Sequence, residues 1–279
     1  MPDQLTTWLR VREQVLWRDI VPHLPTPIRA VRDGFTAHAW IGEDQRRRSL
    51  LLAAYDDVRC AAATSPGLTT NMTARWNGML RGIPAPGFRR GPAFAKKERE
   101  RYGLHADTQQ RYESCLAEAT DLAIPVAARA ARAYLDVAFF HPYDDGNARL
   151  GGLVLHFVLL NAGVELDEVG PILTTVRRAD DSEGAAGLAH MVRGIATATH
   201  RRWVRCQRGE GAPRPPGNGT TNRRPHDSAG TAGIPPSGGS AGTSAHQWDS
   251  PPAGARRLFR FPGTGTAVGN GKGSSSVLT

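Results

Sequence analysis

The residues best suited to chemistry lie together in one short segment, 141–149, which reads His-Pro-Tyr-Asp-Asp-Gly-Asn-Ala-Arg. Its histidine, His141, carries an imidazole that can accept a proton near neutral pH, as a general base must. Asp145 offers a hard oxygen ligand of the kind that Mg²⁺ accepts when substrate phosphates supply further ligands. Tyr143 is expected to pack beneath the loop and fix it. The segment therefore combines a base with a carboxylate that can hold a metal ion.

The second half of this segment has the residues of a phosphate site. Gly146, Asn147 and Ala148 are expected to open a helix, where free backbone N–H groups and the positive end of the helix dipole bind anions. Arg149 adds a fixed cation for phosphate oxygens. A base, a metal ligand and an anion site in one loop favour phosphoryl or nucleotidyl transfer.

Helices are predicted on both sides of this loop, because apolar residues recur there at helical spacing. In the first of them Leu16 and Ile20 are expected to belong to the apolar face. Pro22 and Pro125 are expected to end or interrupt helices. His156, His190 and His200 are interpreted as ordinary helix residues. The predicted helices cover residues 5–20, 45–63, 68–80, 108–140 with a break near Pro125, 150–160 and 185–206.

Helical periodicity fails between residues 84 and 104, where prolines, glycines and charged residues gather. This composition predicts a turn-rich loop or an irregular hairpin over residues 86–94, followed by a charged continuation over residues 96–101. The fold class expected from the whole pattern is all-α, a helical bundle with one short β-hairpin-like interruption.

The C-terminal quarter of the chain has a different composition, since residues 207–279 consist mostly of Gly, Pro, Ser, Thr and Arg. Such a segment buries too little apolar surface to offset the entropy of ordering it, so we expect disorder. The predicted organisation is an N-terminal helical segment (1–44), one folded domain (45–206) and a disordered tail (207–279).

Charge and cysteine content exclude several classes of protein. The net charge of +9 is dispersed and no helix-turn-helix or zinc-finger pattern presents it, so nucleic acid is not the expected partner. The 3 cysteines have neither metal-ligand spacing nor the pattern of a disulfide framework. No signal peptide and no apolar run of membrane-spanning length is present. We therefore expect a soluble, cytoplasmic protein that binds no membrane.

The 141–149 segment resembles the signature of the Fic family, His-x-Phe-x-Asp/Glu-Gly-Asn-Gly-Arg-x-x-Arg. Tyr143 replaces the phenylalanine conservatively, Ala148 stands at the second glycine, and Gly152 stands where the second arginine is expected. The matching residues are His141, Asp145, Gly146, Asn147 and Arg149.

This resemblance implies a Fic-type helical bundle over residues 45–206 and a transferase that uses ATP or another nucleoside triphosphate. His141 would deprotonate a hydroxyl of a target protein, which attacks the α-phosphorus, so that AMP is transferred and pyrophosphate leaves. Asp145 would hold Mg²⁺. The amides of residues 146–148 would cradle the phosphates, and Asn147 and Arg149 would orient the nucleotide.

The two departures from the signature leave the donor open. Without an arginine at Gly152 one contact to the terminal phosphate is missing, and Ala148 adds a methyl group beside the phosphates. Doc-type relatives, which carry lysine at the position of Ala148 and lack the second arginine, act as protein kinases. A Doc-like kinase is therefore one alternative. The other is a catalytically degenerate Fic fold that serves as a nucleotide sensor or scaffold.

The resemblance also implies two partners. Residues 88–104 occupy the place of the Fic flap, which holds a target peptide by edge-on main-chain pairing. The inhibitory motif Ser/Thr-x-x-x-Glu-Gly/Asn of many Fic proteins is absent, since Ala179 lies four residues before Glu183. If the activity is restrained, we expect the inhibitor to be a separate protein.

Overall fold

A computed structural model describes residues 1–39 and 44–209. Apart from its first three positions, the predicted disordered tail (207–279) lies outside the described residues. All described residues fall within one compact unit, in which the N-terminal helix packs against the helices over residues 126–140 and 182–207. The boundary predicted between residues 44 and 45 stays a prediction.

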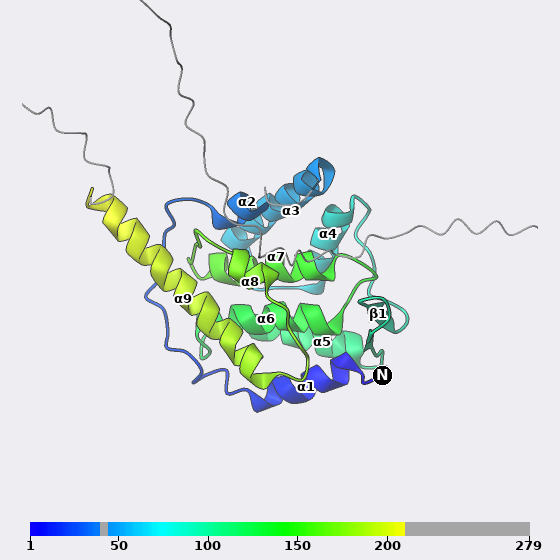
Figure 1. Cartoon of the computed structure of the whole chain (residues 1–279). Helices are drawn as coiled ribbons and strands as arrows, with labels where there is room; N and C mark the ends of the chain where they lie inside the picture. The colour runs from blue at the N-terminus through cyan, green and yellow to red at the C-terminus, as the bar shows by residue number, and fades with distance from the viewer. Residues whose placement is uncertain (40–43, 210–279) are drawn as a thin grey trace, which may run out of the picture. The chain divides into compact units, whose positions relative to one another are not determined.

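Two buried helices, α6 (Val126–Phe140) and α7 (Asn147–Asn161), form the centre of the fold and lie side by side (Figure 1). Every residue of α6 except Ala138 is buried, and its many alanines let neighbouring helices approach closely. The long helix α9 (Ser182–Gln207) packs against α6. The loop between α6 and α7 carries the segment that sequence singles out for chemistry.

Helices α3 (Gln45–Thr64) and α4 (Thr70–Arg81) cover α7, and both confirm the sequence prediction. Their N-termini are capped by side chains, Asp44 in α3 and Thr69 in α4. Gly82 ends α4 in the left-handed conformation, with φ of 66°. These caps explain why both helices begin and end close to the predicted residues.

The predicted helix over residues 108–140 is also confirmed, with its break near Pro125. It consists of α5 (Thr108–Ala117), a 3-10 turn η1 (Glu118–Thr120) and then α6. Two short helices were not predicted, α2 (Gly34–Ala39) and α8 (Gly170–Thr174). Neither is long enough to display a helical repeat of apolar residues.

The N-terminal helix α1 (Gln4–Gln14) is shorter than predicted, so the expected helix over residues 5–20 was wrong in its second half. Val15 already has extended backbone angles, and the indole N–H of Trp17 donates to the carbonyl of Arg12 at 2.9 Å. This bond satisfies a carbonyl at the end of the helix and turns Trp17 into the core. Leu16, expected on the apolar face, is 72% exposed.

The predicted hairpin-like interruption is present as β1 (Ala93–Ala95) paired antiparallel with β2 (Glu100–Tyr102). The base of the hairpin is fastened to the start of α1, because the N–H of Gly103 donates to Asp3 Oδ1 at 2.8 Å. The all-α class with one short hairpin is therefore confirmed.

Within residues 1–39 and 44–209, no helix is long and apolar enough to cross a membrane. The three cysteines form no disulfide with one another. The cytoplasmic location stays a prediction.

Candidate active site

His141 lies at the C-terminus of α6, as the sequence predicts. It caps the helix in the left-handed conformation, with φ of 49° and ψ of 55°, and its N–H donates to the carbonyl of Val137 at 3.2 Å. This conformation is uncommon for a residue with a side chain. It ends α6 and turns the chain into the loop that leads to α7.

The imidazole of His141 is packed against the hairpin. It stacks on the ring of Tyr102 in β2, with centroids 4.4 Å apart and planes inclined by 23°. Tyr102 is itself only 5% exposed. The hairpin therefore forms one wall of the site.

Burial lowers the pKa of His141 to about 4, against the ordinary value of 6.5. The carbonyl of Ala138 acts in the opposite direction, the positive charge of Arg89 lowers the pKa further, and Glu100 and Asp145 raise it. At neutral pH the imidazole is therefore uncharged and free to accept a proton, although it is a weaker base than a solvated histidine.

Arg89, directly before the hairpin, joins the hairpin to the end of α6. Its buried guanidinium donates to the carbonyls of Gly103 and Phe140, and its backbone N–H donates to the carbonyl of Pro142 at 2.9 Å. Burial lowers the pKa of this arginine, and the negative charges of Asp3 and Asp144 raise it. Arg89 thus holds the residues on both sides of His141 in place.

The loop after His141 is held in place by hydrogen bonds of Tyr143 and of Asn147, the first residue of α7. Tyr143 is buried, as predicted, and its hydroxyl lies 2.9 Å from that of Thr73 in α4. The side chain of Asn147 bonds twice to the backbone of Tyr143, accepting at 3.1 Å and donating at 2.6 Å. Asn147 therefore braces the loop with both ends of its amide, and its assigned part in orienting a nucleotide stays a prediction.

The start of α7 presents unpaired donors. Gly146 precedes the helix with φ of 83°, and a Cβ on it would lie 2.9 Å from Nδ2 of Asn77. Asn77 is fully buried in α4 and donates to the carbonyl of Asp145 at 2.8 Å, which fixes the turn. Among the described residues, none accepts a hydrogen bond from the N–H groups of residues 147–149. Free N–H groups at a helix N-terminus can bind an anion, and that these do so stays a prediction.

Two arginines stand beside this helix start. Arg149 of α7 donates to the carbonyl of Leu80 at 3.3 Å and is partly exposed. Arg81, the last residue of α4, places Cγ and Cδ each 3.7 Å from the point where a Cβ on Gly146 would lie. Across residues 1–39 and 44–209, no ion pair or hydrogen bond holds the guanidinium of Arg81. Ala148 is exposed at the same helix start.

Asp145 and Asp144 are both exposed at the edge of the site. Within the described part of the chain, no cluster of three or more His, Cys, Asp or Glu side chains forms a metal cage. A single exposed carboxylate beside an anion site fits Mg²⁺ that takes its remaining ligands from phosphate and water. The part of Asp145 in holding Mg²⁺ stays a prediction.

Position 152, where the Fic signature has its second arginine, lies in the core. A Cβ on Gly152 would lie 3.0 Å from the side chain of Leu173 in α8 and 4.0 Å from that of Phe35 in α2. The Gly152 carbonyl contacts Nδ1 of His156 at 2.8 Å. A larger side chain at this position would require the Leu173 side chain to shift.

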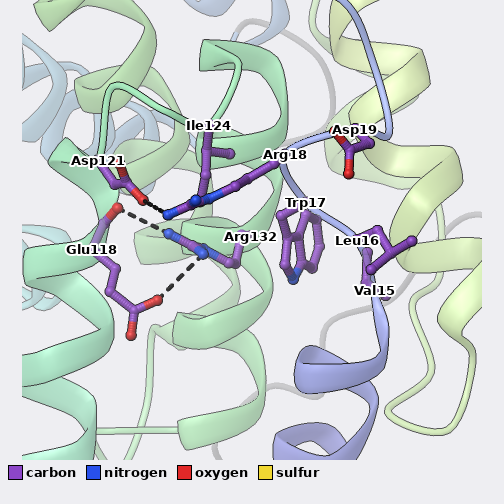
Figure 2. A pocket seen from close by; sticks show the side chains of 9 residues that line it. All are labelled: Val15, Leu16, Trp17, Arg18, Asp19, Glu118, Asp121, Ile124 and Arg132. Atoms are coloured by element: carbon purple, nitrogen blue, oxygen red, sulfur yellow. Dashed lines mark hydrogen bonds and ion pairs between the residues drawn. The ribbon is translucent and has the colours of Figure 1, made fainter.

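A separate surface cavity lies between the segment after α1 and the start of α6 (Figure 2). Its arginines pair with carboxylates, Arg18 with Asp121 at 3.6 Å and Arg132 with Glu118 at 3.2 Å. None of its lining residues belongs to segment 141–149. Its charges are neutralised within the fold, so it is not the anion site.

Sequence reasoning missed four residues that frame the site: Asn77, Arg81, Arg89 and Tyr102. Asn77 and Arg81 come from α4, whereas Arg89 precedes the hairpin and Tyr102 lies in β2. The signals were weak: Arg81 directly follows the helix predicted over residues 68–80, and Arg89 and Tyr102 fall within residues 88–104, which were expected to hold the target but not to contact His141. None of the four could be assigned to the site before the fold placed them.

The fold and the site define a helical protein in which a partly buried histidine precedes a loop and a helix start with free N–H groups. No known protein-family model matches the sequence, and no curated protein matches it.

Solved structures that resemble the chain are Fic proteins. A Fic domain-containing signalling protein from Bacteroides thetaiotaomicron is 14% identical, covers 63% of this chain and 80% of its own, and has a TM-score of 0.46. Fic-1 from C. elegans is 14% identical, covers 74% and 72%, and has a TM-score of 0.45. IbpAFic2, solved in complex with adenylylated Cdc42, is 14% identical, covers 71% of each chain and has a TM-score of 0.44.

Proposed function

We propose that this protein transfers a nucleoside monophosphate, AMP when ATP is the donor, to a hydroxyl side chain of a target protein. The observation that carries the proposal is the placement of an uncharged imidazole, His141, at one end of a loop whose other end is the unpaired N-terminus of α7. A base for the acceptor hydroxyl and a site for the donor phosphates thus lie at the two ends of a six-residue loop, residues 141–146.

In the proposed reaction the target hydroxyl gives its proton to His141 and its oxygen bonds to the α-phosphorus. The bond from that phosphorus to the oxygen bridging to the β-phosphate breaks, and pyrophosphate leaves. The N–H groups of residues 147–149 hold phosphate oxygens, and Arg149 and Arg81 supply positive charge. Mg²⁺ held by Asp145 would neutralise negative charge on the donor.

The target would bind along the hairpin. Strand β1 pairs with β2 on one side only among the described residues, so its other edge can accept a strand of another chain. Phe94, in the middle of β1, is 51% exposed. An exposed ring on an unpaired edge is suited to a peptide side chain. We propose that residues 88–104 hold the target there.

A second candidate is transfer of the terminal phosphate, as in a protein kinase. The observation that favours it is the buried Gly152, because an arginine for the terminal phosphate of the donor is missing there and the Leu173 side chain lies 3.0 Å from the position of a Cβ. A nucleotide bound in the reverse direction would present its γ-phosphorus to the hydroxyl that His141 deprotonates.

The two candidates are separated by the position of the label. The purified protein is incubated with Mg²⁺, cell lysate and each nucleoside triphosphate in turn, labelled at the α- or the γ-phosphorus. Labelled protein from the α-position alone supports nucleotidyl transfer, and labelled protein from the γ-position alone supports the kinase. If the protein binds nucleotide but no donor gives labelled protein, the remaining hypothesis is a Fic fold that serves as a nucleotide sensor or scaffold.

A further inference from the structure

The ring that contacts His141 comes from the hairpin. Tyr102 is the last residue of β2, and its ring lies nearly parallel to the imidazole at a centroid distance of 4.4 Å. Offset stacking at such a distance is an attractive contact. It fixes the plane of the imidazole and covers one of its faces.

Tyr102 is itself held on several sides. Its hydroxyl donates to Oε2 of Glu100 at 2.8 Å, and Oε1 of Glu100 accepts from Nζ of Lys96 at 2.6 Å. The next residue, Gly103, is bonded through its N–H to Asp3 and through its carbonyl to Arg89. The ring is therefore anchored to the hairpin, and the hairpin is anchored to α1 and α6.

Hydrogen bonding is not what fixes the plane of the His141 imidazole. A catalytic imidazole is usually oriented by a carboxylate or carbonyl bonded to its second nitrogen. Here Nδ1 is buried, and across the described part of the chain it makes no hydrogen bond of standard geometry. Hydrogen bonding with the backbone of Ala138 raises the pKa of the ring, but its alignment is too poor to fix the ring alone. The stack on Tyr102 is the contact of good geometry that sets the direction of the imidazole.

We propose that Tyr102 is a positioning residue that holds the imidazole of His141 in the plane needed for proton transfer. The hairpin would then orient the base as well as bind the target. This inference rests on the proposed function for its effect on rate, but the orientation itself can be measured without any activity.

The test compares two variants of the full chain. Tyr102→Phe keeps the aromatic ring and loses only the hydroxyl bonded to Glu100. Tyr102→Leu keeps an apolar side chain and loses the ring. Stacked protons experience the ring current of their neighbour, so the imidazole protons of His141 in NMR spectra report whether the two rings face each other. His141→Gln assigns those resonances by removing them.

We expect the His141 resonances to be displaced upfield in the native protein and in Tyr102→Phe, and to lose that displacement in Tyr102→Leu. With the α-labelled donor, kcat should fall about 10- to 100-fold in Tyr102→Leu, since a small misplacement of a reacting group costs that much. Tyr102→Phe should stay within about twofold of the native rate, and the KM for the target should change less than kcat in both.

Two results would overturn the inference. One is a His141 resonance that is the same in Tyr102→Phe and Tyr102→Leu, whether or not any transfer is found. The other is an active native protein whose kcat Tyr102→Leu leaves unchanged. If Tyr102→Leu fails to fold, as judged by its melting temperature, Tyr102→Met provides a longer apolar side chain for the same comparison. Absence of transfer in the native protein would contradict the proposed function alone, and the resonances would still decide the orientation.

Discussion

Helix α6 presents polar groups in its middle and at its C-terminal end, and these two sets differ in whether they have hydrogen-bond partners. In its middle Asp136, which is fully buried, accepts from Nε of Arg12 at 2.8 Å and from the indole of Trp8 at 2.9 Å. One turn earlier Arg132 pairs with Glu118. These contacts tie α1 and η1 to α6, so the polar groups of this region serve stability.

The C-terminal end of α6 is arranged in the opposite way. Nδ1 of His141 is buried without a hydrogen bond of standard geometry, and the N–H groups at the start of α7 have no acceptor among residues 1–39 and 44–209. Unsatisfied polar groups lower the stability of a fold, and they are retained where a ligand completes them. The polar groups in the middle of α6 are paired and stabilise the fold, whereas those at its C-terminal end and at the start of α7 lack partners in the described part of the chain and are available to a ligand.

The largest expected effect on stability comes from the paired region. Arg12→Ala would leave Asp136 buried without its cation, which costs about 3–5 kcal/mol in similar buried pairs. The free energy of unfolding in urea measures the loss. Arg18→Ala is the matched control, because the Arg18 side chain is 68% exposed and its pair with Asp121 should contribute less than about 1 kcal/mol. An equal loss of unfolding free energy in Arg12→Ala and Arg18→Ala would contradict the claim that the buried pair contributes more to stability than the exposed one.

A smaller effect is expected from the buried imidazole of His156 in α7. Burial lowers its pKa to about 4 from 6.5, while the Gly152 carbonyl raises it. Because the unfolded chain binds the proton more readily, the stability from this group is complete above pH 6.5 and is lost as the pH falls toward 4. The loss should reach about 3 kcal/mol at most.

Urea unfolding between pH 7.5 and 4 checks this prediction by comparing the native chain with His156→Gln, whose loss of stability should be smaller. His190→Gln, at an exposed position of α9, should show the native dependence. A native dependence in His156→Gln would show that another group is responsible.

Gly146→Ala tests the open region. Its φ of 83° disfavours a side chain, and the new Cβ would meet Asn77 at 2.9 Å. We expect a loss of about 1–2 kcal/mol in unfolding free energy from the backbone conformation, together with weaker nucleotide binding in calorimetric titration. Gly187→Ala in α9 is the control, because a Cβ there meets nothing within 4 Å. Unchanged nucleotide binding in Gly146→Ala would argue against the anion site.

The smallest effect is expected from Arg81→Ala. Its Cγ and Cδ lie beside Gly146 and its guanidinium has no partner among the described residues, so removal should spare the fold and weaken binding of the phosphates. A loss of about tenfold in nucleotide affinity corresponds to about 1.4 kcal/mol. Arg59→Ala, which removes an exposed pair with Asp33, should leave the affinity unchanged. Equal affinity in both variants would exclude Arg81 from the site.

Much of this arrangement follows from local sequence. The helices around the loop were predicted because their apolar residues recur at helical spacing, and His141 was placed at a helix end for the same reason. The end of α1 was wrong, because the bond from Trp17 to Arg12 depends on a side chain leaving the helix. The roles of Tyr102, Arg89 and Asn77 could not be predicted, since each contacts segment 141–149 from a part of the chain distant in sequence.

The most direct test of the central claim is transfer of label from the α-phosphorus by the native protein, His141→Ala and His190→Ala, each with Mg²⁺ and cell lysate. The account predicts labelled protein with the native chain and with His190→Ala. It also predicts a rate lower by about 10²–10⁴ in His141→Ala, the usual contribution of a general base. Label that is incorporated equally by His141→Ala, at an unchanged melting temperature, would contradict the assignment of this end of α6 to catalysis.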